Sequence, residues 1–117
     1  AHFLTFVPYA ALSPFHVWIF PKRHSASFSD INEDEVGDLA AHLKALFKKL
    51  HGGLEDPDYN YVFRSSRPKD LGNEYSHWYI SVVPRVSKAA GFELGSGMYI
   101  NTCLPEESAA FLRGIKV

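Results

Sequence analysis

The sequence predicts an α+β domain with a mostly antiparallel sheet in the order ββαββ, one long helix on a face of that sheet, and a short C-terminal strand–helix appendage. Three observations lead to this prediction. Apolar runs rich in aromatic and β-branched residues precede and follow a single long segment. That segment repeats its apolar residues at helical spacing. The first two runs are joined only by AALSP, a connection short enough for a hairpin.

Two strands are expected at the start of the chain. Residues 3–9 (FLTFVPY) and 15–20 (FHVWIF) are apolar, aromatic and β-branched, which is typical of strands. The second run is apolar on both faces, so it is expected in the centre of the sheet rather than at an edge. The stretch PKRHSASFSD that follows is polar and is expected to be a loop.

A long helix is the clearest expected element. Asp30 and Glu33 form a D-x-x-E pattern that indicates where it begins. HGG at 51–53 indicates where it ends. Between these limits the apolar residues recur at helical spacing: Val36, Leu39, Ala40, Leu43, Leu46, Phe47 and Leu50.

The second half of the chain completes the predicted sheet. YNYVFRS at 59–65 and HWYISVVP at 77–84 are expected to be the third and fourth strands, separated by a polar loop. SKAAGFELGSG is glycine-rich and is expected to be a loop. MYIN is then expected to be a short strand, and LPEESAAFLR a short helix with Pro105 near its first turn.

Residues 1–117 are expected to form a single domain, because this length suits one core and is short for two. The formal net charge of −1 gives no global attraction to nucleic acid or to an anionic membrane. No apolar run approaches the roughly 20 residues of a membrane span. The first residues, AHFLTFV, read directly as a strand, so we expect the chain to be a piece of a longer protein.

The chain contains a single cysteine, Cys103. One cysteine excludes an internal disulfide and also excludes a cysteine-rich zinc site built from this chain alone. This cysteine usage fits a reducing compartment, so a cytoplasmic location is expected.

Histidines are the first candidates for chemistry. His42 and His51 fall on the helix, where solvated or capping roles are expected, and His16 is expected to be a satisfied histidine of the core or of a sheet edge. His24 directly follows the second strand and His77 opens the fourth, so the two could meet in a ββαββ sheet. Two histidines form half of a tetrahedral zinc site. The alternative is that FPKRH is only a basic turn.

Two further patterns bear on catalysis. A histidine nucleophile needs an imidazole aimed at phosphorus, and neither Tyr79 nor Ser81 supplies one. No G-x-S-x-G, H-E-x-x-H or Walker-type motif is present. The glycines of GFELGSG at 91–97 would let backbone N–H groups approach a phosphate, although by itself the pattern favours a tight loop between strands.

Three strings resemble the histidine triad (HIT) superfamily, and more closely the C-terminal half of the galactose-1-phosphate uridylyltransferase family. FVPYAALSPFHVWIFPKRH resembles the opening hairpin of that family. HWYISVVPR falls where HIT proteins carry H-φ-H-φ-H-φ-φ, and GFELGSGMYINTCLPEESA resembles a following segment that compact HIT hydrolases lack. The likeness covers nearly the whole chain and implies a HIT-like fold.

The resemblance implies that this chain is the C-terminal half of a transferase built from two HIT-like halves. The family's nucleophilic histidine lies in the other half, in a string such as H-P-H-P-H-x-Q that is absent here, so no catalytic residue is expected in this chain. A structural zinc is implied at His24 and His77, with the remaining ligands outside the chain. Substrate contacts are implied for Lys88, Ala89, Ala90, Gly91, Phe92, Glu93, Ser96 and Gly97.

The implied reaction is nucleotidyl exchange between a nucleotide sugar and a sugar 1-phosphate, as in galactose metabolism, with this chain inactive by itself. The expected partners are these two substrates and an N-terminal HIT-like half or a second HIT-like subunit, with neither nucleic acid nor membrane. The alternative is a free-standing, non-catalytic HIT-like module that binds nucleotides or a protein. A HIT hydrolase is disfavoured by Tyr79. Uridine and adenosine both stay open as the nucleoside.

Overall fold

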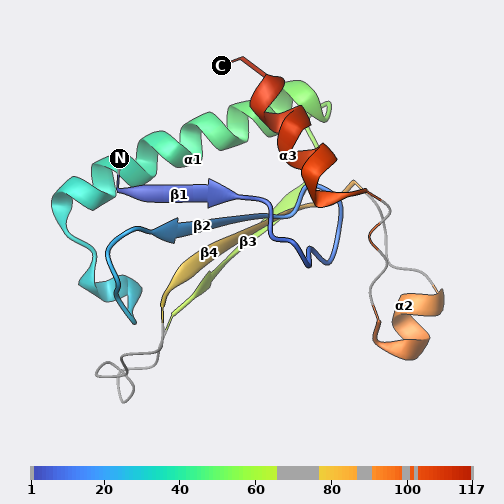
Figure 1. The fold of residues 1–117 in the computed structure, drawn as a ribbon, viewed down its shortest axis with the longest axis horizontal. Helices are drawn as coiled ribbons and strands as arrows, with labels where there is room; N and C mark the ends of the chain where they lie inside the picture. The colour runs from blue at the N-terminus through green and yellow to red at the C-terminus, as the bar shows by residue number, and fades with distance from the viewer. Residues whose placement is uncertain (1, 66–76, 87–90, 99–100, 102, 117) are drawn as a thin grey trace.

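The computed structural model describes residues 2–65, 77–86, 91–98, 101 and 103–116 (Figure 1). Within these residues one four-stranded sheet has the order β1-β2-β4-β3. Every neighbouring pair in it is antiparallel. The strands are β1 (Phe3–Phe6), β2 (Val17–Pro21), β3 (Tyr59–Arg64) and β4 (Tyr79–Pro84). The predicted ββαββ order, the antiparallel pairing and the central place of the second strand are confirmed.

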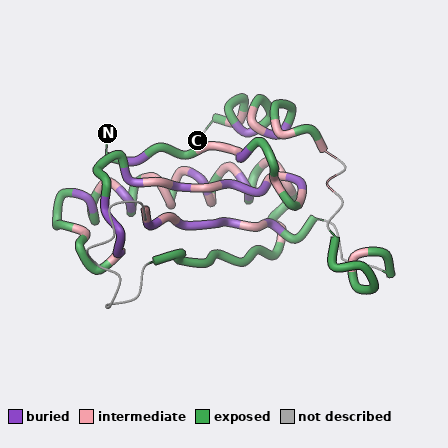
Figure 2. Tube along the Cα trace, turned by 60° about the horizontal axis from the view of Figure 1, so that its bottom comes forward, coloured by how far each residue is buried: buried purple, intermediate pink, exposed green. Residues whose placement is uncertain are grey.

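The two central strands carry the core. Val17 is in register with Val82, and Ile19 with Ile80, and all four side chains are at most 1% exposed. Side chains of a strand alternate between faces, so these residues define the face of the sheet that packs against the long helix. Figure 2 shows burial concentrated in β2 and β4, whereas β3 is exposed along its length.

The first two strands are shorter than the sequence predicts. The ranges 3–9 and 15–20 were expected to be extended, but β1 ends at Phe6 and β2 begins at Val17. Pro8 has no N–H for a ladder hydrogen bond, and Phe15 adopts a positive φ of 60°, which lies outside the extended region. The residues between the strands therefore form turns instead of a continued hairpin.

The long helix α1 (Glu33–Gly53) begins two residues later than the D-x-x-E pattern suggests. Asp30 ends a short 3₁₀ turn, η1 (Phe28–Asp30). Asn32 is the N-cap: its side chain accepts a hydrogen bond from the Glu35 N–H at 2.9 Å, and the Glu35 carboxylate accepts one from the Asn32 N–H at 3.2 Å. This reciprocal capping box satisfies two backbone donors at once, which fixes the start of the helix.

Two short helices follow β4. Residues 91–97 were predicted to be a loop, but Gly91–Ser96 form the helix α2, so that prediction is wrong. The C-terminal helix is confirmed as α3 (Pro105–Gly114), with Pro105 at its first turn, where a missing N–H has no cost. The predicted strand MYIN lies largely outside the described residues. None of the helices that the structure describes is long and apolar enough to cross a membrane.

Candidate functional site

The sheet face away from α1 carries the residues of chemical interest. On β2 they alternate with the core residues Val17 and Ile19, and on β4 they alternate with Ile80 and Val82, so both sets point to the same face. Phe6 of β1 and His24, just after β2, extend this set. We call the following residues the ring cluster: Phe6, His16, Trp18, Phe20, His24, His77 and Tyr79.

The rings of this cluster touch one another in a continuous series across three strands. Phe20 and Tyr79 are stacked, with centroids 4.8 Å apart and planes 2° apart. Trp18 lies 5.0 Å from Tyr79 and 6.0 Å from Phe6, measured between centroids. These side chains are only half-buried, so they present flat apolar surface to solvent. Such a surface can accept a planar group by stacking.

The structure brings together the two histidines that the sequence suggested as metal ligands. The centroids of His24 and His77 are 5.2 Å apart, and His77 also lies 5.3 Å from Phe20. The Nδ1 of His77 is 3.0 Å from the Trp78 carbonyl oxygen. A carbonyl only accepts, so Nδ1 carries the proton and the lone pair of Nε2 is available to a metal.

This arrangement fits half of a zinc site. Within the described part of the chain, no group of three or more histidine, cysteine or acidic side chains could hold a metal ion. A structural zinc site uses four ligands, so two would come from elsewhere. The donor chemistry therefore agrees with zinc only if other residues complete the site.

His16 is buried in this face, but it is only partly satisfied. Its Nε2 lies 2.6 Å from the Ser81 hydroxyl, whereas its Nδ1 has no hydrogen-bond partner among the described residues. The expectation of a fully satisfied histidine is therefore wrong for one nitrogen. Burial lowers the pKa of His16 below its ordinary value, because a charged imidazole loses its hydration there. The ring is held neutral against Ser81.

The residues predicted to contact substrate lie away from the histidine pair. His77 precedes β4 and α2 follows it, and this strand of six residues spans roughly 20 Å at about 3.3 Å per residue. Figure 1 shows α2 projecting beyond the sheet, at the end opposite to the start of β4. Three of the predicted residues, Lys88, Ala89 and Ala90, are outside the described residues. The other five, Gly91, Phe92, Glu93, Ser96 and Gly97, are on or directly after α2.

Local hydrogen bonds occupy the end of α2. The Ser96 hydroxyl donates to the Phe92 carbonyl at 2.6 Å and accepts from the Met98 N–H at 3.1 Å. The Gly97 N–H donates to the Glu93 carbonyl at 2.9 Å, and Gly97 has a φ of +75°, which glycine adopts without strain. These donors close the helix, so a ligand here would meet mainly exposed surface, such as the Phe92 ring.

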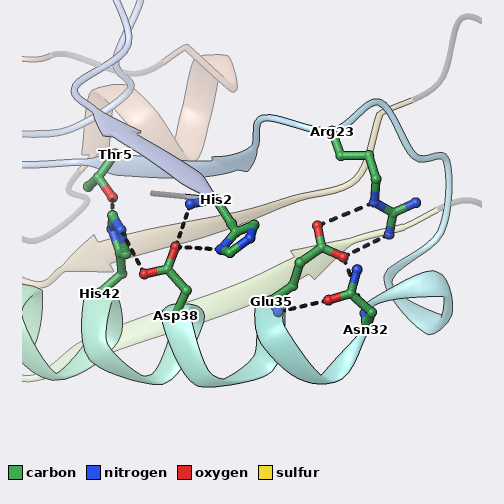
Figure 3. Close-up of polar contacts among 7 residues, drawn as sticks. All are labelled: His2, Thr5, Arg23, Asn32, Glu35, Asp38 and His42. Atoms are coloured by element: carbon green, nitrogen blue, oxygen red, sulfur yellow. Dashed lines mark hydrogen bonds and ion pairs between the residues drawn. The ribbon is translucent and has the colours of Figure 1, made fainter.

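The histidines at the start of the chain and on α1 have structural contacts (Figure 3). His2 Nδ1 lies 3.3 Å from an Asp38 oxygen, and His42 lies 3.8 Å from the other oxygen of the same carboxylate. His42 also contacts the Thr5 hydroxyl at 3.4 Å. The pKa of Asp38 is lowered to about 2, chiefly by a hydrogen bond from the His2 backbone N–H. The group joins β1 to α1.

The fold and the sheet face identify the class of protein. The HIT domain family matches residues 1–88, and the chain therefore belongs to the HIT family. The predicted resemblance is confirmed, since the relatives include ADP-glucose phosphorylase and galactose-1-phosphate uridylyltransferases.

Two curated relatives and one solved structure show the likeness in detail. ADP-glucose phosphorylase of Arabidopsis thaliana is 38% identical over 119 residues, which cover 100% of this chain and 34% of the relative. Galactose-1-phosphate uridylyltransferase of Thermotoga maritima is 29% identical over 125 residues, covering 99% of this chain and 39% of the relative. The crystal structure of the Arabidopsis thaliana ADP-glucose phosphorylase with bound ADP-glucose has a TM-score of 0.92 at 37% identity, covering 100% of this chain and 39% of that one. The chain thus spans well under half the length of these relatives.

Most of the ring cluster was missed by reasoning from the sequence. His16, Trp18 and Phe20 are spaced two residues apart, as are His77, Tyr79 and Ser81. That alternation places each set on one face of a strand, so it could have indicated the ring cluster. The cluster was not predicted from it because the apolar residues between these positions made β2 look buried on both faces.

Proposed function

We propose that this chain is the C-terminal HIT-like domain of a nucleotidyltransferase that exchanges a nucleotidyl group between a nucleotide sugar and a sugar 1-phosphate. The observation that carries the proposal is the likeness over the whole chain to ADP-glucose phosphorylase. On the same ground the donor is ADP-glucose and the nucleoside is adenosine. The ring cluster then forms part of the wall of the substrate pocket.

The chemistry of the described residues supports a binding role without a nucleophile. Tyr79 and Ser81 occupy positions where HIT proteins carry histidine. His16 is buried and bonded to Ser81, and the free Nε2 of His77, whose Nδ1 bonds a carbonyl, is assigned to a metal in this proposal. A nucleotidyl-histidine intermediate would therefore form on the other half of the protein. The chain by itself is inactive in this proposal.

Substrate contacts are assigned to two places. Stacking on the ring cluster suits the flat base, because aromatic stacking is worth about 1–3 kcal/mol per base. On the resemblance alone, contacts to phosphate and sugar come from residues of the segment 88–97, namely Lys88, Ala89, Ala90, Gly91, Phe92, Glu93, Ser96 and Gly97. The exposed Phe92 ring and the glycines of α2 leave the described part of that segment, residues 91–97, accessible to a ligand.

The ring cluster can be tested in the protein made from its complete gene. We expect nucleotidyl transfer to a sugar 1-phosphate to be faster from ADP-glucose than from UDP-glucose, and Tyr79→Leu to raise the KM for ADP-glucose about tenfold through lost stacking. Tyr9→Leu is the matched control, because Tyr9 is 89% exposed and takes no part in the cluster. Equal KM values for the two variants would contradict the role of the cluster. Nucleotide binding without turnover would support the non-catalytic module instead.

His24 and His77 are proposed to hold a structural zinc together with two ligands from outside this chain. Zinc in such a site links chain segments and contributes folding energy. The test is the zinc content of the protein made from its complete gene. We expect about one zinc per chain, lost on His24→Gln or His77→Gln and kept on His51→Gln, whose histidine contacts only Asp56 in the described structure. Zinc retained in the first two variants would contradict the assignment.

The exposed edge of the sheet is proposed as the contact with the other HIT-like half or with a second subunit. Tyr59, Tyr61, Val62 and Phe63 on β3 are 40–55% exposed. A long edge strand with large apolar side chains on both faces is an association surface that proteins normally cover. Covering β3 would also satisfy its free backbone groups.

A further inference from the structure

A second site lies on the helix side of the sheet, and of the residues that line it only Phe6 also belongs to the ring cluster. It is a cavity of about 370 Å³ between β1, the second half of α1, and α3. Its lining includes Thr5, Phe6 and Val7 from β1 and the residue after it, Leu46 of α1, and Ala109 and Leu112 of α3. This volume is at the small end of the range for small-molecule pockets, about 300–1,000 Å³.

Two cations and no acidic side chain line this mainly apolar cavity. They are Lys49 of α1 and Arg113 of α3. The Lys49 ammonium donates to the carbonyls of Leu112 and Ile115 at 2.9 and 2.8 Å. An ammonium has three donors, so one remains. No ion pair involves Arg113 among the described residues, and its guanidinium has five donors.

The shape and the charge select one kind of ligand. An apolar cavity binds an apolar group, and the pair of cations at its rim complements a single negative charge. At the roughly 30 Å³ that a water molecule occupies in the liquid, the cavity holds about 12 non-hydrogen atoms. We propose that this cavity binds a medium-chain aliphatic carboxylate, with the alkyl tail between β1 and α3 and the carboxylate on Arg113 and the free donor of Lys49.

The simplest competing explanation is that both cations only stabilise α3. Lys49 satisfies carbonyls at the C-terminal end of that helix, and a cation near this end also interacts favourably with the helix dipole. That explanation accounts for Lys49 fully. It does not require an open apolar cavity beside the two cations, so the two explanations differ in whether an amphiphilic anion binds.

Octanoate is the probe, titrated into the ¹⁵N-labelled protein made from its complete gene and followed by NMR. We expect saturable shifts of the amide signals of Thr5, Val7, Ala109 and Arg113, with a Kd of about 1 mM, which requires only a modest ligand efficiency from octanoate. Octylammonium has the same tail and the opposite charge, so it should bind at least about tenfold more weakly. Absent or non-saturable shifts with octanoate, or equal binding of the two probes, would overturn the proposal.

Two variants locate the ligand. Arg113→Gln should weaken octanoate binding about tenfold, through the loss of a charge-assisted contact. Ala109→Leu should abolish binding by filling the cavity, with a dispersed spectrum showing that the variant is folded. Arg64→Gln is the matched control, since Arg64 lies on β3 at the other edge of the sheet. Unchanged binding in Arg113→Gln would overturn the proposal even if Ala109→Leu failed to fold.

The outcome is independent of the proposed transferase function. Apart from Phe6, the cavity is lined from the side of the sheet that faces α1, whereas the nucleotide sugar is assigned to the opposite face, where Tyr79 lies. Tyr79→Leu should therefore leave octanoate binding unchanged, and Arg113→Gln should leave the KM for ADP-glucose unchanged. If octanoate binding fell in Tyr79→Leu, the probe would be bound on the ring cluster and the cavity proposal would be wrong.

Discussion

Replacing Glu35 by alanine should destabilise the domain far more than the same change two residues earlier. Glu35 is 2% exposed, although it is an acidic residue in the first turn of a surface helix. Its carboxylate accepts hydrogen bonds from the Asn32 N–H at 3.2 Å and from Arg23 Nη2 at 2.8 Å (Figure 3). Glu33 is exposed in the same turn, so Glu33→Ala is the matched control.

The expected loss follows from these contacts. Loss of a capping interaction costs about 1 kcal/mol. Hydrogen bonds to a carboxylate contribute about 1.5–3 kcal/mol, of which the lower value applies because the Arg23 side chain is 48% exposed. The higher helix propensity of alanine offsets this loss by a few tenths of a kcal/mol. Glu35→Ala should therefore lower the free energy of unfolding by about 2 kcal/mol, against less than about 1 kcal/mol for Glu33→Ala, which loses only its interaction with the helix dipole.

Urea denaturation at pH 7 measures the difference, as a midpoint lower by about 1 M in Glu35→Ala. The pKa of Glu35 is lowered in the folded chain, first by the hydrogen bond from Arg23. The charge-dependent part of the contribution of Glu35 to stability is therefore complete at a pH above 4.5, its pKa in the unfolded chain. It is lost as the pH falls through the lower folded pKa. Equal midpoints for the two alanine variants at pH 7 would refute the assigned role of Glu35.

Three further predictions concern other parts of the fold. Burial lowers the pKa of His16 below 6.5, so the unfolded chain binds the proton more readily and stability should fall as the pH drops below about 6.5. His16→Gln should make the melting temperature depend less on pH between pH 7.5 and 5.5. A pH dependence equal to that of the unmodified protein would contradict this. A methyl group on Gly53 would collide with the Ile115 side chain, whereas one on Gly52 meets nothing within 4 Å. In urea denaturation, Gly52→Ala should thus raise the free energy of unfolding by up to about 1 kcal/mol through helix propensity, and Gly53→Ala should raise it clearly less. Equal increases in the two variants would show that the collision with Ile115 costs nothing. In the protein made from its complete gene, Val62→Lys should weaken the contact proposed between β3 and the other HIT-like half or subunit, and so lower the melting temperature. An unchanged melting temperature would contradict that contact.

Much of the fold could be predicted because its signals are local. Leu39, Leu46 and Leu50 were expected on the apolar side of the helix, and all three are buried. Val36 belongs to the same repeat but is 51% exposed. Glu35 takes the buried position in that turn because its carboxylate is satisfied by Asn32 and Arg23. Hydrophobic periodicity cannot anticipate such an exchange, since it depends on a partner 12 residues away.

The candidate site was predictable only in part, for a similar reason. The meeting of His24 and His77 followed from strand order, and the structure confirms it. The contact of His16 with Ser81 joins residues 65 positions apart and depends on the register of β2 with β4. The helix α2 was read as a loop because its glycines suggest turns, whereas their hydrogen bonds close a short helix.

The central proposal is that this domain binds a nucleotide sugar while the nucleophile lies in another part of the protein. The most direct test is to mix the protein made from its complete gene with ADP-glucose alone and to map the nucleotidylated peptide by mass spectrometry at neutral pH. We predict one adenylylated histidine, located outside residues 1–117, and unchanged labelling in Ser81→Ala. An adenylyl group on His16, His24, His77 or Tyr79 would contradict the account, because the nucleophile would then lie in this chain.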